Sequence, residues 1–320
     1  MLLHAGVGEE VGEHCERRLP GTRDPAPVRR VGSAVAVVGA ILLAGCSGGS
    51  SNRAGHTSGG SSAAPTTTVT TNPLSLDGPT ALISTLTAIE RGLRTPGDTD
   101  AARLGRAQVR AYGTLVSHPE WRASVLTGVP PDVQAAVTAN LDAAASLESL
   151  TTGGPPATTL PHWTIRAPRP EATLLAYYKE AEAATGVPFG YLAGIHLIES
   201  RLGRIMGPSS AGAQGPMQFL PATWATYGRG GNIDDDHDSI LAAARLLAAH
   251  GGAANITRAL LSYNDDQRYA RAVQDYAGVL AANVAAFDGY YQWPVVYETS
   301  TGTYELPEGY PTQPAIRRSG

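Results

Sequence analysis

The sequence predicts an all-α protein that ends in one short β-hairpin. Apolar residues recur at helical spacing from about residue 76 to 151 and again from 171 to 287. Proline and glycine divide these segments, as Pro130-Pro131 and Gly186-Val187-Pro188 do. No strand pattern precedes residue 294, and residues 295–304 around Gly302 are compatible with a hairpin.

The length of 320 residues is typical of about two domains. The formal net charge of −4 gives no basic footprint, which argues against a nucleic-acid-binding protein. Two cysteines, Cys15 and Cys46, cannot form a disulfide scaffold. The abundance of alanine and the single lysine, Lys179, are typical of a G+C-rich bacterium.

An export signal is predicted near the N-terminus. Arg29 and Arg30 precede an uncharged run at 31–45, which is too short for the roughly 20 residues of a membrane-spanning helix. The run ends in the letters LAGC, which resemble a bacterial lipoprotein cleavage box. The resemblance implies that Cys46 carries lipid and begins the mature protein. The alternative, a buried helix followed by a free thiol, is disfavoured because Ser, Gly and Thr follow at once.

Composition divides the chain into six parts. These are a signal region at 1–45, with a true start nearer Val28; the lipidated Cys46 and a disordered Ser/Gly/Thr tether at 46–73; a helical spacer domain at 74–151; a Pro/Gly linker at 152–170; a second helical domain at 171–292; and a C-terminal tail at 293–320. The tether has a reach of about 30 Å. We therefore expect an exported protein, anchored to the cell membrane and facing the cell wall.

Glu199 is the first candidate catalytic residue. It follows an apolar helical segment, and Ile195 and Leu202 share its helix face. Desolvation there disfavours the charged carboxylate and raises its pKa. A general acid in glycosidic cleavage needs that property. Pairing of the carboxylate with Arg201 or Arg204 is an equally open alternative from position alone.

The residues after Glu199 resemble the lytic murein transglycosylases, which are relatives of goose-type lysozyme. The segment ESRLGRIMGPSSAGAQGPMQFLPATW carries most of the resemblance, and its GPMQF wording is closer to the membrane-bound B-type enzymes. A later segment, LSYN at 261–264, and Tyr269 match the Tyr-Asn motif of the family. The resemblance covers about residues 170–280. It implies a lysozyme-like, goose-type catalytic domain behind the helical spacer.

The resemblance assigns Glu199 as the catalytic acid and base. It places five further residues in the sugar site: Ser209, Met217, Gln218, Tyr263 and Asn264. The Gln218 amide supplies a donor and an acceptor for an N-acetyl group, and the Tyr263 ring supplies a face for a pyranose. Taken singly, Met217 as core filler, Gln218 as a loop cap and Tyr263 as a half-buried helix residue remain alternatives.

The implied reaction uses one carboxyl group. In the family, a single Glu protonates the bridging oxygen between N-acetylmuramic acid and N-acetylglucosamine, then deprotonates the C6 hydroxyl that closes a 1,6-anhydro ring. The resemblance implies peptidoglycan glycan strands as the partner. We expect no cofactor and a monomeric protein. Two alternatives stay open: a hydrolytic muramidase of the same fold, and a peptidoglycan-binding lipoprotein without turnover.

An acidic stretch at 232–238 suggests calcium at first sight. Three of its acids, Asp234, Asp236 and Asp238, have the spacing of the first ligands of an EF-hand. Ser239 then stands where glycine is needed, and Arg245 where glutamate is needed. The sequence therefore predicts no metal, and Asp238 is predicted to cap the next helix.

Overall fold

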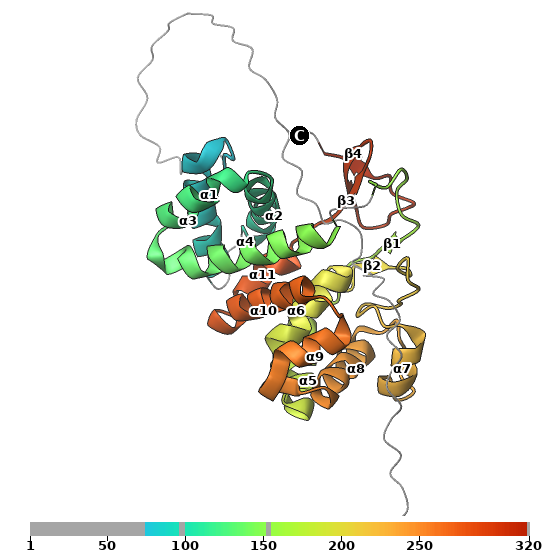
Figure 1. Ribbon diagram of the computed structural model, residues 1–320. Helices are drawn as coiled ribbons and strands as arrows, with labels where there is room; N and C mark the ends of the chain where they lie inside the picture. The colour runs from blue at the N-terminus through green and yellow to red at the C-terminus, as the bar shows by residue number, and fades with distance from the viewer. Residues whose placement is uncertain (1–73, 96–99, 152–154, 319–320) are drawn as a thin grey trace, which may run out of the picture. The chain divides into compact units, whose positions relative to one another are not determined.

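The computed structural model describes residues 74–95, 100–151 and 155–318. The predicted signal region, Cys46 and the tether lie outside these residues. The described part contains eleven α-helices and five short strands, so the predicted mostly helical class is confirmed (Figure 1). Within that part, no helix has both the length and the apolar content to cross a bilayer.

The first helical region folds around its own apolar core. Its elements are α1 (Gly78–Leu93), α2 (Ala101–Ser117), the 3-10 helix η1 (Pro119–Trp121), α3 (Arg122–Gly128) and α4 (Pro131–Thr151). In α1, Leu82, Leu86 and Ile89 recur every three or four residues and are completely buried. Pro131 opens α4, because the first turn of a helix does not need the missing N–H.

A buried polar cluster ties this region to the C-terminal helices. The carboxylate of Glu90 accepts hydrogen bonds from the Tyr112 hydroxyl at 2.6 Å and the Gln108 amide at 2.9 Å. Gln108 in turn accepts from the Trp293 indole at 2.8 Å. The region around α1–α4 therefore packs on the residues that follow α10.

The second helical region contains seven further α-helices. These are α5 (Glu171–Thr185), α6 (Phe189–Ser200), α7 (Pro221–Tyr227), α8 (Asp236–Ala249), α9 (Ile256–Tyr263), α10 (Gln267–Ala282) and α11 (Ala286–Tyr291), with a 3-10 helix η2 (Gly252–Asn255) before α9. The helical pattern that the sequence shows up to residue 287 does not form one continuous helix after α9. It breaks after Ala282 because the Asn283 side chain accepts a hydrogen bond from the Ala285 N–H at 2.9 Å and starts a new turn.

The helix cap predicted at Asp238 is also wrong. α8 begins at Asp236, and Asp235 is its N-cap. The Asp235 carboxylate accepts from the N–H groups of His237 at 2.9 Å and Asp238 at 3.2 Å.

Two small sheets accompany the helices. Their strands are β1 (Thr164–Ile165), β2 (Ile205–Met206), β3 (Val295–Thr299), β4 (Gly302–Leu306) and β5 (Ile316–Arg317). The β3–β4 hairpin confirms the prediction, and β5 extends it by one strand. The prediction of no strand before 294 is wrong for β1 and β2, whose two residues each are too few to show an alternating pattern.

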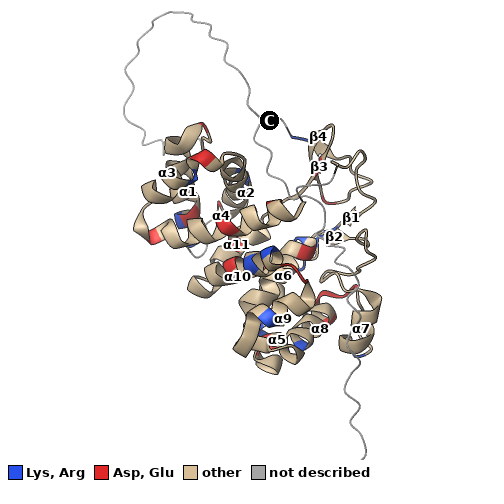
Figure 2. Ribbon diagram, in the orientation of Figure 1, with Lys and Arg blue, Asp and Glu red and all other residues tan. Residues whose placement is uncertain are grey.

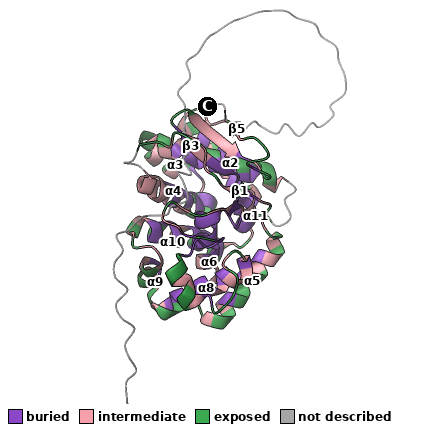
Figure 3. Cartoon of the chain, turned by 90° about the vertical axis from the view of Figure 1, so that its right-hand side faces the viewer, coloured by how far each residue is buried: buried purple, intermediate pink, exposed green. Residues whose placement is uncertain are grey.

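Helix α6 lies in the centre of the second region and carries Glu199. It is packed by α5, α8 and α10, and every residue from Leu192 to Ser200 is buried (Figure 3). A helix that is apolar on all sides is stable only when neighbours cover all of it. The last turn of α6, including Glu199, is therefore shielded from water.

Candidate active site

Glu199 lies in the last turn of α6, and its side chain is almost fully removed from water. The residue is 5% exposed, and its Oε1 accepts a hydrogen bond from the Tyr269 hydroxyl at 2.6 Å. Burial raises the pKa of Glu199 to about 8, although the Tyr269 hydrogen bond acts in the opposite direction. The predicted desolvation of this carboxyl is confirmed, and the group is protonated at neutral pH.

The alternative pairing of Glu199 with an arginine is not observed. Among the described residues, the carboxyl of Glu199 forms no ion pair, and the Arg201 guanidinium lies 5.2 Å from the Trp293 ring instead. Helix α6 ends abruptly because Arg201 and Leu202 both adopt left-handed backbone angles, with φ of 54° and 60°. This conformation is uncommon for residues other than glycine, and it turns the chain away from the carboxyl.

The loop 214–219 is fixed directly beside the end of α6. The Ser200 hydroxyl donates to the Pro216 carbonyl and accepts from the Gly203 N–H at 2.9 Å. Gln214 and Phe219 exchange two backbone hydrogen bonds at 2.9 Å. Gly215 has a φ of +73°, and a Cβ there would lie 1.9 Å from the Ile233 carbonyl oxygen, so only glycine fits.

Two tyrosines connect this loop to the carboxyl. The Tyr263 hydroxyl donates to the Met217 carbonyl, and the Tyr269 hydroxyl donates to Glu199. The two rings are nearly parallel, with centroids 6.4 Å apart. The structure therefore brings together three of the predicted site residues, Glu199, Met217 and Tyr263.

Gln218 presents an unused acceptor next to them. Its φ is +47°, its amide nitrogen donates to the Gly215 carbonyl at 2.9 Å, and it is 8% exposed. Its Oε1 has no hydrogen-bond partner among the described residues. Met217 differs from its predicted role, since its side chain is fully buried in the core and only its carbonyl faces Tyr263.

Ser209 and Asn264 are not hydrogen-bonded to Glu199. The Ser209 hydroxyl accepts from the N–H groups of Ala211 at 3.2 Å and Ala213 at 3.0 Å, which shapes the turn before Gly212. Asn264 follows α9 in an extended conformation, and its carbonyl accepts from the Asp266 N–H at 2.8 Å. Both residues remain predictions as substrate contacts.

Sequence reasoning missed a buried polar cluster behind α6. Asp236 is fully buried and accepts from Arg166 Nη2 at 2.6 Å, while its Oδ1 lies 3.4 Å from His196 Nε2. His196, one turn before Glu199, hydrogen-bonds to the Tyr178 hydroxyl at 2.8 Å through Nδ1. Arg166 also donates to the Gly203 carbonyl at 2.8 Å, so the cluster contacts the turn after α6 as well.

Most of the acidic stretch around the start of α8, coloured red in Figure 2, is engaged with protein groups. Asp236 faces inward, so the three acids with EF-hand spacing do not share one site. Asp235, His237 and Asp238 have potential ligand atoms within 4.8 Å of one another. Asp235 caps α8, His237 hydrogen-bonds to Glu180, and Asp238 accepts from the Asn232 N–H.

The site contains one buried proton donor, the carboxyl of Glu199. Within the described part of the chain, no second carboxylate forms a hydrogen bond or ion pair with Glu199. Comparison with protein-family models, curated proteins and solved structures gives no match. The sequence motifs and the geometry around Glu199 are therefore what indicate a function.

Proposed function

We propose that this chain is a lytic transglycosylase that cleaves the bond between N-acetylmuramic acid and N-acetylglucosamine in peptidoglycan. The proposal includes a lysozyme-like, goose-type fold for the second helical region. The observation that carries it is the buried carboxyl of Glu199, whose pKa is raised to about 8 by burial, beside a loop with the predicted family motif. A carboxyl that keeps its proton at neutral pH is a competent general acid.

Glu199 performs two proton transfers in this mechanism. Its proton goes to the bridging oxygen as the bond from that oxygen to C1 breaks. The Tyr269 hydroxyl stabilises the resulting carboxylate by its hydrogen bond. The carboxylate then takes the proton of the muramic acid C6 hydroxyl, and that oxygen bonds to C1. The acid is regenerated, and water is not consumed.

The loop residues orient the sugar in the proposal. The free Oε1 of Gln218 accepts an N–H from an N-acetyl group, and its backbone is held by the turn at Gly215. Met217 holds Tyr263 through its carbonyl instead of touching the sugar with its side chain. Ser209 and Asn264 line the approach to the site. Export, the lipid at Cys46 and a monomeric state belong to the same proposal.

Product analysis separates this function from its two alternatives. Purified protein is incubated with purified peptidoglycan, and the masses of the soluble fragments are measured by mass spectrometry. A transglycosylase releases 1,6-anhydro ends, which are lighter by one water than the reducing ends that a muramidase leaves. A binding protein without turnover releases neither. Reducing ends would replace our proposal by the muramidase.

Replacing Tyr269 with Phe is expected to raise the pH at which activity falls. Glu199 must be protonated to act, so activity declines as pH rises through its pKa of about 8. The Tyr269 hydrogen bond lowers that pKa, and its removal moves the decline to higher pH. The rate at neutral pH should fall roughly ten- to a hundredfold, because a hydrogen bond to a charged group contributes about 1.5–3 kcal/mol.

Tyr263→Phe is the matched control for this experiment. Its hydroxyl bonds to the Met217 carbonyl and not to Glu199. This variant should bind sugar less well while its pH profile keeps the position of the wild type. Equal displacement of both profiles would contradict a specific role of Tyr269.

A further inference from the structure

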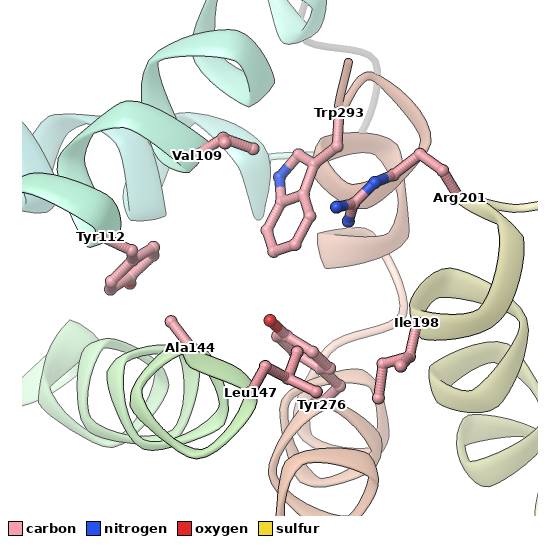
Figure 4. A pocket seen from close by; sticks show the side chains of 8 residues that line it. All are labelled: Val109, Tyr112, Ala144, Leu147, Ile198, Arg201, Tyr276 and Trp293. Carbon is pink, nitrogen blue, oxygen red and sulfur yellow. The ribbon is translucent and has the colours of Figure 1, made fainter. Parts of the chain in front are cut away.

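A small cavity lies where the end of α6 meets α2, α4 and α10 (Figure 4). Its volume is about 20 Å³. The walls are mainly apolar and include Val109, Leu147 and Ile198. Two polar groups interrupt them, the guanidinium of Arg201 and the hydroxyl of Tyr276, and both point inward (Figure 4).

Arg201 is a buried charge without an anionic partner. The residue is 2% exposed, and its Nε and Nη2 have no hydrogen-bond acceptor in the part of the chain that the structure describes. Burial lowers the pKa of Arg201 to about 10, so the group keeps its charge at neutral pH. Trp293 lies 5.2 Å from the guanidinium carbon, and such a contact compensates only part of the cost of desolvation.

The hydroxyl of Tyr276 adds a second free donor. It makes no hydrogen bond within the described residues, whereas its aromatic neighbours are satisfied. Tyr112 donates to Glu90 at 2.6 Å, Tyr290 to Asn140 at 2.6 Å and Trp293 to Gln108 at 2.8 Å. No carboxylate lines the cavity. The cavity therefore presents hydrogen-bond donors and a positive charge, and no acceptor or carboxylate among its lining residues pairs with them.

We propose that this cavity binds one small monovalent inorganic anion of the size of chloride. A volume of about 20 Å³ holds a water-sized occupant, which requires roughly 10–15 Å³, and excludes an organic ligand. A water molecule would satisfy one or two donors but leave the charge uncompensated. An anion accepts from the guanidinium and the hydroxyl together and neutralises the charge.

The anion joins segments that are far apart in the sequence. Arg201 follows α6, Tyr276 is on α10, and Leu147 on α4 lines another part of the wall. A ligand that binds only the folded state stabilises it in a saturable way. The proposed site is therefore structural, and it is independent of the proton transfer at Glu199.

Thermal unfolding of the full chain tests the proposal. Chloride is titrated against gluconate at constant sodium concentration and neutral pH, since gluconate is too large for the cavity. The wild-type melting temperature should rise by about 2–4 °C and then level off. Arg201→Met should show no rise, and in gluconate alone it should melt at or above the wild-type temperature because the unpaired charge is gone.

Arg204→Gln is the matched control variant. Its side chain is partly buried and donates to the Tyr291 carbonyl at 2.8 Å, away from the cavity. This variant should melt at a lower temperature and keep the full chloride response. An equal chloride response in the wild type and Arg201→Met would overturn the proposal.

A direct measurement keeps the test independent of variant folding. Wild-type crystals soaked in bromide should give one anomalous peak in the cavity between Arg201 and Tyr276. The absence of a peak there, or a wild-type melting temperature indifferent to chloride, would show that the cavity holds only water and would reject the anion site.

Discussion

Replacing Glu199 with Gln is expected to reduce the release of soluble fragments from peptidoglycan by about 10²–10⁴-fold. Gln has nearly the same shape and can still accept from the Tyr269 hydroxyl, but it has no proton to give to the bridging oxygen. The loss should appear in the turnover rate, while binding to purified sacculi stays close to the wild type. Undiminished release of fragments would remove Glu199 from the mechanism.

The same variant should be more stable than the wild type in alkaline solution. The folded-state pKa of Glu199 is about 8, against the ordinary value of 4.5. Between pH 4.5 and about pH 8 the folded protein holds a proton that the unfolded chain has released, so the free energy of unfolding falls as pH rises. At roughly 1.4 kcal/mol per pKa unit, the wild type loses up to about 5 kcal/mol by pH 8.

Urea unfolding at pH 5 and pH 8.5 measures this difference. Glu199→Gln lacks the titrating group, so its unfolding free energy should change less between the two conditions. Identical pH dependence in both proteins would mean that the carboxyl is wet and ionised in the folded state. That result would also contradict its role as a general acid at neutral pH.

The burial of Glu199 was predictable from Ile195, which precedes it by four positions on the same face of α6. The expectation that Leu202 shares this face is wrong, because α6 ends at Ser200 and Leu202 has a left-handed backbone. The absence of an ion pair between Glu199 and Arg201 was not predictable from the sequence. Residues at i and i+2 do not share a helix face, and the left-handed turn at Arg201 and Leu202 sends the guanidinium toward Trp293. No local sequence pattern marks such a turn in residues other than glycine.

Long-range polar contacts were the second feature that sequence reasoning missed. Arg166, His196 and Asp236 are 30 to 70 positions apart, and nothing in their local patterns shows that they meet. Residues 152–170 read as a Pro/Gly linker by composition. In the structure, Ile165 is buried and Arg166 reaches Asp236, so the described part of this segment is packed against the second helical region.

Asp236→Ala is expected to produce the largest loss of stability among the polar substitutions considered. Removing one partner of a buried ion pair costs about 3–5 kcal/mol. We expect about 3 kcal/mol, the lower end, because the Arg166 and Arg169 side chains are 32% and 48% exposed and can turn toward water. His196 cannot do so, since it is fully buried. Urea unfolding at neutral pH measures the change.

Asp234→Ala is the control, since Asp234 is exposed and forms no ion pair in the described part of the chain. Its unfolding free energy should stay within about 0.5 kcal/mol of the wild type. A similar loss in both variants would mean that the acidic stretch acts through its general charge and not through the buried cluster.

Measuring the unfolding free energy at low pH separates the contribution of the Asp236 charge from that of its side-chain packing. Burial raises the pKa of Asp236, but the neighbouring His196 and the charge of Arg166 outweigh it, so the pKa lies below its ordinary value of 3.8. The stabilisation is therefore complete above pH 3.8 and is lost as pH falls below it. The difference between wild type and Asp236→Ala should narrow over that interval. A constant difference down to the lowest pH would show that the side chain stabilises α6 by packing, and that the position of Glu199 does not depend on the ion pair behind it.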